Sequence, residues 1–199
     1  MPVPGKIMTT EQLININRKI TEESINWVQK KVLSLSENQL NWRPNPGIWS
    51  VREILAHLNS YASYYYDVFG QKIEKTKFRN SKEEFTSSPL GRSAWKSMKL
   101  GNANNVKRKF KAPKVHNPSL DPGLIHDDEA QRFIEWQKKL LRTLDLAGDV
   151  NLKKVKVPIS ISKIVRLRLG DALLYVSYHV ERHIQQIKNL QNSPNFPKK

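Results

Sequence analysis

The sequence predicts an all-α protein, a four-helix bundle, and three observations support this prediction. Four segments place apolar residues at helical intervals. Two of these segments begin with a start signal, a serine or threonine followed three residues later by a glutamate or glutamine. A long irregular stretch separates the second helix from the third, and such a stretch can carry the chain from one end of a bundle to the other. Helices two and three should therefore run parallel, within a single domain that covers residues 1–199.

The first helix is expected from about residue 9 to residue 35. Thr9 and Gln12 have the spacing of a capping box. The apolar residues that follow at roughly helical intervals are Leu13, Ile16, Ile20, Ile25, Trp27 and Val28. A second capping-box sequence at Ser36 predicts one short helical turn. Residues 43–47 then form a loop, because their two prolines and their glycine cannot continue a helix.

The second helix has the clearest start in the sequence. Residues 50–53 read Ser-Val-Arg-Glu, so the serine and glutamate side chains can each satisfy a free backbone donor of the other residue. This helix is expected over about residues 50–78. Beyond it the helical pattern fails, because three prolines and two glycines interrupt it. A basic irregular insertion is therefore expected at about residues 80–120, with a run of lysines and arginines at residues 107–114.

The third and fourth helices follow that insertion. Helix three is expected over about residues 127–146, and Gly148 is suited to end it. Residues 155–161 are short, rich in β-branched side chains and interrupted by a proline, so they should form an extended connector. Helix four is expected over about residues 171–189.

Composition narrows the chemistry that the chain can carry. There is no cysteine, which excludes a disulfide scaffold, a thiolate zinc finger and a cysteine nucleophile. The formal net charge is +16, which can attract nucleic acid, anionic membranes or acidic substrates, or can reflect a lysine-rich solvated surface. The first residues lack the apolar region of a signal peptide. No apolar run is long enough to span a bilayer, so a cytoplasmic location is expected.

Three of the five histidines form a candidate metal site. His179 and His183 stand four residues apart in the fourth helix, so they share one face, about 6 Å apart along the axis. That face has the spacing of an inward-pointing seam, and His57 lies near the apolar side of the second helix. Three imidazole ligands would leave positions open for water or substrate, whereas ordinary core histidines would be hydrogen-bonded to neighbours. The H-E-x-x-H pattern of zinc peptidases is absent.

Two motifs resemble those of the DinB-like superfamily, a family of small damage-inducible metalloproteins. Residues 49–58, Trp-Ser-Val-Arg-Glu-Ile-Leu-Ala-His-Leu, are similar to its second-helix motif, and residues 35–44 are similar to the approach to that helix. Residues 179–187, His-Val-Glu-Arg-His-Ile-Gln-Gln-Ile, are similar to its last-helix motif. The resemblance implies a four-helix bundle with up-down-down-up topology and a metal triad from these two helices. In this chain the triad falls on His57, His179 and His183.

The resemblance also implies a reaction class. Several members of the family are transferases or isomerases that use a low-molecular-weight thiol. We therefore expect a protein that binds a divalent transition metal, zinc or nickel, and acts as a metal-dependent thiol S-transferase on a small-molecule substrate. Glu53 and Tyr61 lie one turn on either side of His57 and are candidates to support the ligands or to transfer a proton, although Glu53 also fits a plain capping role. Arg182 is a candidate to meet a substrate carboxylate, or else a solvated arginine at the bundle edge.

Two other functions stay open on the sequence. One is a non-specific nucleic-acid-binding protein, in which residues 107–114 contact phosphates and Phe110 stacks on a base. No known nucleic-acid motif accompanies that run, so neither a specific nucleic acid nor a membrane is expected as a partner. The other is a catalytically inactive metal-binding bundle. His116 and His126 are expected on the surface. The tyrosines at positions 61, 64, 65 and 66 should pack in the core and rim, and could support a homodimer.

Overall fold

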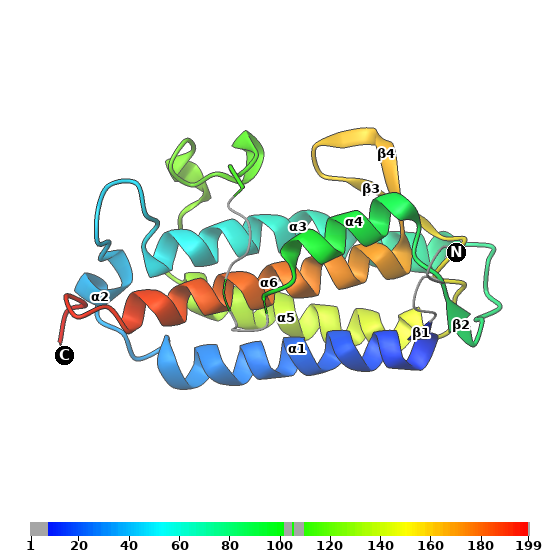
Figure 1. Ribbon diagram of the computed structural model, residues 1–199, viewed down its shortest axis with the longest axis horizontal. Coiled ribbons are helices and arrows are strands. Elements are labelled where there is room, and N and C mark those ends of the chain that lie inside the picture. Colours follow the sequence, from blue (N-terminus) through cyan, green and yellow to red (C-terminus); the bar gives the residue numbers. More distant parts are fainter. Residues whose placement is uncertain (1–7, 102–104, 106–109, 199) are drawn as a thin grey trace.

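A four-helix bundle forms the body of the molecule, as the sequence predicts (Figure 1). The computed structural model describes residues 8–101, 105 and 110–198, and no helix among them is long and apolar enough to cross a membrane. The long helices are α1 (Thr10–Lys31), α3 (Val51–Lys75), α5 (Glu129–Ala147) and α6 (Leu169–Gln191). Helices α1 and α3 each pack on both α5 and α6. The colours in Figure 1 show that α3 and α5 run in one direction while α1 and α6 run in the other.

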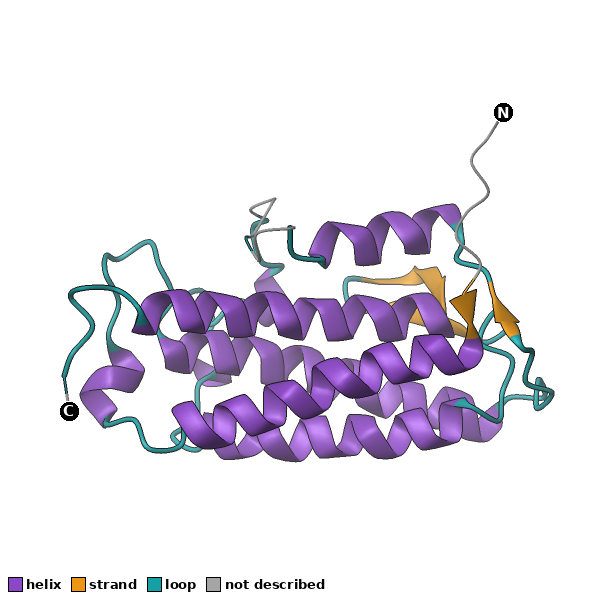
Figure 2. Cartoon of the chain, turned by 60° about the horizontal axis from the view of Figure 1, so that its bottom comes forward, coloured by secondary structure: helices purple, strands orange, loops and turns teal. Residues whose placement is uncertain are grey.

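Shorter elements connect and cover the bundle. Helix α2 (Glu37–Asn41) precedes α3, and helix α4 (Pro89–Met98) packs outside the bundle against α6. Two antiparallel pairs of strands lie at one end (Figure 2): β1 (Met8–Thr9) with β2 (Glu84–Phe85), and β3 (Lys156–Ile159) with β4 (Ser162–Arg168). Two single turns of 3-10 helix, η1 (Lys114–His116) and η2 (Pro122–Leu124), lie in the connection between α4 and α5.

The helix starts are those that the sequence predicts. The side chains of Thr9, Ser36 and Ser50 each accept a hydrogen bond from the backbone three residues further on, and the glutamine or glutamate at that position bonds back to the cap. All three are capping boxes. They fix where α1, α2 and α3 begin, and so they fix the phase of the face that each helix turns to the core.

The expectation of an irregular insertion at about residues 80–120 is wrong in part, because α4 lies within it. Pro89 and Gly91 suggest helix breaks in the sequence, yet both lie in the first turn of α4. A proline is tolerated there, because the backbone N–H that it lacks would have no partner within the helix. Ser88 is the N-cap, and its hydroxyl accepts a hydrogen bond from the backbone of Gly91. Of the predicted basic run, residues 107–109 lie outside the described residues.

The expected extended connector at residues 155–161 is one half of a β-hairpin. Strand β3 is extended as predicted, but it pairs with β4, which the sequence does not reveal. Leu167 is the one buried residue of β4, so this strand lacks the alternation of apolar and polar residues that marks a half-buried strand. The strand passes directly into α6 at Leu169, two residues before the predicted start.

Asp171, near the start of α6, holds α4 in place. Its side chain is completely buried, and its Oδ2 accepts hydrogen bonds of 3.0 Å from both the backbone N–H and the hydroxyl of Ser88. Gly91 lies so close that a Cβ added there would come within 2.1 Å of the Asp171 Cγ. Trp95 of α4 also stacks on Tyr178 of α6, with ring centroids 5.9 Å apart. Helix α4 is therefore a fixed outer layer on α6.

The apolar core has two parts along the bundle axis. One part lies toward the strands, and its buried residues include Leu13, Tyr66, Phe69, Leu140, Leu144 and Leu173. The other lies toward α2 and includes Val28, Ile54, Leu55, Phe133, Ile134 and Ile187. On α6 the two parts meet between Tyr178 and Val180, where His179 lies, and on α3 they meet just after His57. His179 therefore lies at the boundary between the two parts, while His57 and His183 lie among residues of the part toward α2.

Candidate metal centre

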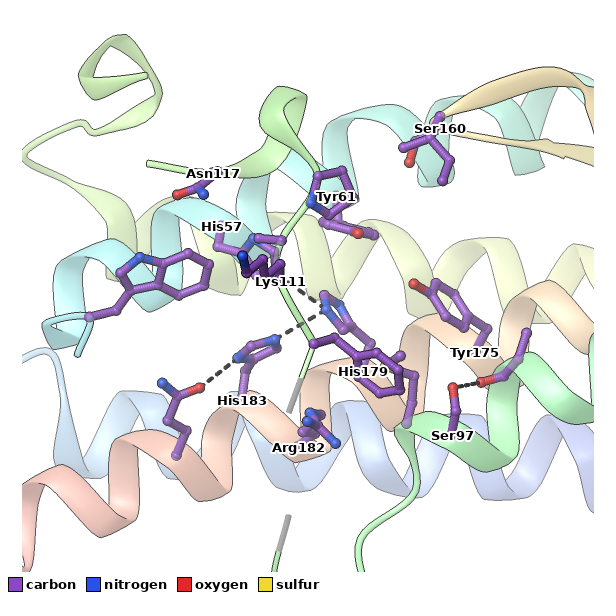
Figure 3. Close-up of a pocket in the computed structure, with 18 of the residues that line it drawn as sticks. His57, Tyr61, Ser97, Lys111, Asn117, Ser160, Tyr175, His179, Arg182 and His183 are labelled. Atoms are coloured by element: carbon purple, nitrogen blue, oxygen red, sulfur yellow. Dashed lines mark hydrogen bonds between the residues drawn. The ribbon is translucent and has the colours of Figure 1, made fainter. Parts of the chain in front are cut away.

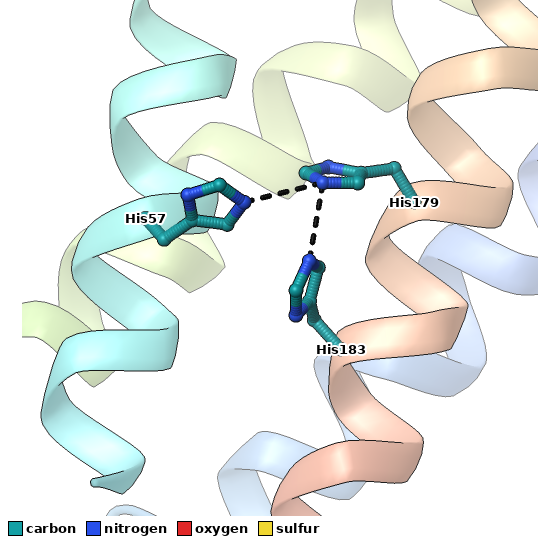
Figure 4. A group of neighbouring side chains, drawn as sticks. All are labelled: His57, His179 and His183. Atoms are coloured by element: carbon teal, nitrogen blue, oxygen red, sulfur yellow. Dashed lines mark hydrogen bonds between the residues drawn. The ribbon is translucent and has the colours of Figure 1, made fainter. Parts of the chain in front are cut away.

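Three histidine side chains converge on one point between α3 and α6 (Figure 4). Nε2 of His179 lies 3.2 Å from Nε2 of His57 and 3.1 Å from Nε2 of His183. One nitrogen from each ring lies within 4.8 Å of the other two, so the group could hold a single metal ion. The structure thus brings together the three residues that the sequence singles out, although His57 is 122 residues from His179 in the chain.

Hydrogen bonds at the opposite ring nitrogens orient two of these histidines. Nδ1 of His57 lies 2.5 Å from the backbone carbonyl oxygen of His116. Nδ1 of His183 lies 3.0 Å from the side-chain oxygen of Gln186. Both partners are acceptors, so the network assigns the ring proton to Nδ1 in each case and leaves a lone pair on Nε2. Metal-binding histidines are commonly fixed in this way.

The hydrogen-bonding capacity of the rings favours a cation at their meeting point. Nε2 of His179 faces two nitrogens that both present lone pairs. A neutral ring can donate at most one proton through that atom, so one of the two short contacts would otherwise join lone pair to lone pair. A shared cation would satisfy all three nitrogens at once. The donor set therefore fits a divalent transition metal.

Burial keeps the three imidazoles neutral. His57 is 2% exposed and His179 is 5% exposed, whereas His183 is partly buried at the cavity edge. Burial lowers the pKa of His57 to about 4 and lowers the pKa of His179 and of His183 well below the usual value. The neighbouring histidines and the charge of Arg182 lower the pKa of the latter two further. Neutral imidazole is the form that binds metal.

His116 belongs to the site, and the prediction that it lies on the surface is wrong. The residue is 4% exposed, its ring centroid lies 4.0 Å from that of Tyr61, and its Nδ1 lies 2.7 Å from the hydroxyl oxygen of Ser60. Burial lowers the pKa of its imidazole to about 4. The sequence holds no signal for this role, because His116 follows no apolar periodicity and orients His57 through a backbone atom.

Aromatic rings enclose the histidines. The ring of Trp49 lies 4.9 Å from that of His57, and the ring of Tyr61 lies 4.4 Å from that of His179. Tyr175 stacks on His179 at 5.9 Å with an interplanar angle of 5°. These contacts restrict the ligand rings to one orientation. Neither Trp49 nor Tyr175 is predicted as a site residue, because an aromatic residue on a helix face or at a helix start usually packs in the core.

A cavity of about 1080 Å³ opens beside the three histidines (Figure 3). Its walls come largely from outside the four long helices: the loop before α3, helix α4, the connection at residues 110–120 and the β3–β4 hairpin. Most of the wall side chains are apolar, and they include Ile48, Leu90, Met98, Leu120, Ile161 and Val165. Among the described residues of the lining, Lys111 and Arg182 are the charged ones, and both are positive.

The other candidate residues differ in whether they line the cavity. Glu53 completes the capping box of α3, as its capping role requires, pairs with Arg43 at 3.2 Å, and does not line the cavity. Tyr61 does line the cavity. Arg182 also lines it and is 6% exposed, so the expectation of a solvated arginine is wrong. The Arg182 guanidinium lies over the ring of Phe110, 5.5 Å from its centroid.

Comparison with known proteins gives three findings. The model of the DinB superfamily matches residues 21–187. The uncharacterized protein YuaE of Bacillus subtilis (strain 168) is 24% identical over 158 residues, which are 79% of this chain and 86% of YuaE. The structure of YfiT from Bacillus subtilis, described as a probable metal-dependent hydrolase with an unusual four-helix bundle topology, aligns with a TM-score of 0.50 and 20% identity. That alignment covers 95% of this chain and 91% of YfiT, and it supports the fold.

Proposed function

The chain belongs to the DinB superfamily, and from this premise we propose that it is a divalent-metal-dependent enzyme, a thiol S-transferase that uses a low-molecular-weight thiol. The observation that carries the proposal is the convergence of three imidazole nitrogens beside a large cavity. His57, His179 and His183 would hold the ion, with zinc or nickel as the expected metal. When bound, such an ion lowers the pKa of a thiol, so that the nucleophilic thiolate is available at neutral pH.

The side chains of the protein would prepare the site for nucleophilic attack. The low pKa values of the buried histidines keep their rings in the ligating form. Trp49 and the apolar walls exclude water from one side of the ligand rings, which strengthens every charge interaction within the site. The cavity would bind the thiol and the electrophile side by side, so that their reaction would no longer require a bimolecular collision in solution.

The hydroxyl of Tyr61 is suited to donate a hydrogen bond or a proton beside the histidines. Burial raises the pKa of Tyr61 to about 12, so its hydroxyl stays protonated at neutral pH and can donate a hydrogen bond to a substrate oxygen. A hydrogen bond with Tyr175 lowers the pKa of Tyr61 and raises that of Tyr175, as expected if the Tyr175 hydroxyl is the donor. Tyr175 would thus stabilise negative charge on the Tyr61 oxygen after a proton has left.

A metal-dependent hydrolase is the second candidate, because YfiT is described as a probable enzyme of that kind. Water would then be the nucleophile, and metal hydrolases of the H-E-x-x-H type use a carboxylate as the general base. Among the described residues that line the cavity, none is an aspartate or a glutamate. A thiol with a pKa of about 8.5 loses its proton far more readily than water does, so the composition of the lining favours the transferase.

Metal analysis is the first test of this proposal. The purified protein should contain one divalent ion per chain, and His57→Ala, His179→Ala and His183→Ala should each lose it. His126 is exposed, so His126→Ala is the matched control and should keep the ion. Metal retained by all three triad variants would contradict the site itself.

An activity assay is the second test. The metal-loaded protein should accelerate the addition of low-molecular-weight thiols to a chromogenic electrophile, and the triad variants should not. Hydrolysis of nitrophenyl esters is the competing assay. Hydrolysis that requires metal but no thiol would replace the transferase by the hydrolase. Metal binding without either reaction would instead leave a catalytically inactive metal-binding bundle.

A further inference from the structure

We infer that the cavity beside the histidines binds an amphipathic organic acid, with its carboxylate toward Arg182 and its apolar body along the outer walls. The inference rests on the proposed function for the role of the cavity as a substrate site, and it adds the chemical class of that substrate. Three features of the described residues carry it: the charge of the lining, the position of Arg182 and the apolar mouth.

The charged side chains in the described part of the lining are both positive. Lys111 and Arg182 line the cavity (Figure 3), and no aspartate or glutamate does so among the described residues. A metal ion bound by the nearby histidines would add further positive charge. A cavity of this sign attracts anions and disfavours cations.

Arg182 is placed to meet an anion inside the cavity. It is 6% exposed, directly precedes His183 on α6, and has its guanidinium over the ring of Phe110 at 5.5 Å. A guanidinium binds a carboxylate through two parallel hydrogen bonds. Because water screens a buried charge less than an exposed one, this contact is worth more here than on the surface.

The mouth of the cavity is apolar. Apart from Phe110, which contacts Arg182, four large apolar side chains line the cavity and remain 38% to 63% exposed: Leu90, Leu120, Ile161 and Val165. They come from three separate segments, namely α4, the connection after it and the β3–β4 hairpin. Exposed apolar side chains that gather around a groove indicate a binding surface for apolar groups.

Arg182 and the apolar mouth lie at different depths in the cavity, and this difference fixes the orientation of the ligand. Arg182 is buried beside the histidines, whereas Ile161 of the hairpin is 63% exposed. The carboxylate should therefore enter first and the apolar body should remain near the mouth. A volume of about 1080 Å³ lies just above the usual range for the pockets of drug-sized ligands, so the cavity accommodates a medium-chain acid.

Decanoate and 1-decanol test the inference on the unmodified chain, because they share an apolar chain length and differ in charge. Calorimetric titration, with the metal present and again after chelation, should give a Kd for decanoate at least about tenfold below that for 1-decanol. The preference should persist after chelation, since it depends on Arg182. Equal affinity for the two ligands, or no binding of decanoate, would overturn the inference.

Matched variants test the contacts of the carboxylate and of the apolar body of the ligand separately. Arg182→Gln should remove the preference for the acid, whereas Lys188→Gln, which removes the same charge from α6 outside the lining, should keep it. Ile161→Ser should weaken both ligands. Ile164→Ser should weaken neither, because Ile164 is 90% exposed and does not line the cavity. A preference for the acid that survives Arg182→Gln in a variant with native thermal unfolding would contradict the assigned orientation.

The outcomes also separate this inference from the proposed function. Metal binding and thiol-dependent activity without any preference for decanoate would overturn the ligand class alone. Decanoate binding that depends on Arg182, in a chain that binds no metal, would support the ligand class and contradict the proposed function.

Discussion

The side-chain oxygen of Gln186, 3.0 Å from Nδ1 of His183, selects the nitrogen that this histidine offers to a metal. Gln186→Leu removes the acceptor, so the ring can turn or change tautomer. Loss of such an outer partner typically costs about tenfold to a hundredfold in metal affinity. Competition with a chromogenic chelator should therefore show at least about tenfold weaker binding.

Gln185→Leu is the matched control for that substitution. Gln185 is bonded to Asn189 and does not line the cavity, so its loss should leave the metal affinity unchanged. Equal losses in the two variants would point to a general effect on α6 rather than to the orientation of His183.

The buried histidines should make the metal-free protein sensitive to acid. Burial lowers the pKa of His57 and of His116 to about 4, against 6.5 for the ordinary side chain. Between these values the unfolded chain binds more protons than the folded one, so stability falls as the pH falls. The contribution of each histidine is complete above about pH 6.5 and is lost toward about pH 4, where the loss amounts to roughly 3 kcal/mol per residue.

Urea unfolding of the chelator-treated protein across this pH range would measure that effect. The midpoint should move to lower urea concentration as the pH falls. A midpoint that does not change between about pH 6.5 and about pH 4.5 would show that these imidazoles are not held neutral in the folded state.

At the residue scale, the convergence of the three histidines could be predicted and their surroundings could not. Helical spacing places His179 and His183 on one inward face, and His57 lies on the apolar side of its own helix. The tyrosines also lie as predicted, with Tyr61, Tyr65 and Tyr66 buried and Tyr64 at the rim. The role of His116 depends on where an irregular connection crosses α3, and local periodicity carries no information about that.

At the scale of elements, the contact between α4 and α6 is a tight point of the fold. A Cβ at position 91 would come within 2.1 Å of Asp171 Cγ. Asp171 is completely buried and accepts a hydrogen bond from Ser88, so its side chain cannot easily move away from the added Cβ. Gly91→Ala should therefore destabilise the docking of α4, and overpacking of this kind typically costs about 1–3 kcal/mol. Hydrogen exchange of the amides at residues 90–98 should become faster.

Gly70 provides the opposite case for comparison. Nothing lies within 4 Å of a Cβ added there, and the residue is in the interior of α3. Gly70→Ala should stabilise the protein by roughly 0.5–1 kcal/mol, because alanine loses less backbone freedom than glycine in a helix. Similar effects of the two substitutions would show that α4 does not depend on the space at Gly91.

The elements differ in how well the sequence predicts them. The four long helices carry an apolar face, and two of them, α1 and α3, also begin with a capping box, so two independent signals agree for those two. Helix α4 buries only Gly91 and begins with residues that usually indicate a break, so its pattern has no clear core face. Strand β4 is similarly exposed along most of its length. Helix α4 and strand β4 lie on the bundle rather than within it, and the sequence predicts neither.

For the whole molecule, the net charge of +16 predicts weak binding to nucleic acid that does not depend on base sequence. Binding of this kind releases counterions and should fall steeply between about 50 mM and about 200 mM salt. Fluorescence anisotropy with DNA duplexes of unrelated sequence should give equal affinities at each salt concentration. Tight binding to one sequence at physiological salt would instead favour the nucleic-acid-binding alternative.

The architecture as a whole follows from the sequence more closely than the cavity does. Four amphipathic segments and one long connection predict a bundle, because each apolar face has to be buried against another. The cavity walls depend on contacts between α4, residues 110–120 and the β3–β4 hairpin. These segments are far apart in the chain, and only the folded structure shows that they face one space.

The three histidines and the cavity walls are encoded in different stretches of the gene. The histidines come from the first third of α3 and from the middle of α6, whereas the walls come mainly from the connections between long helices. Connections tolerate substitution and changes in length better than packed helices do. Selection can therefore alter what descendants of this protein accept as a substrate while the inherited helices keep their histidines in register. The residues at the mouth of the cavity can therefore change from one descendant to another while the group of three histidines stays the same.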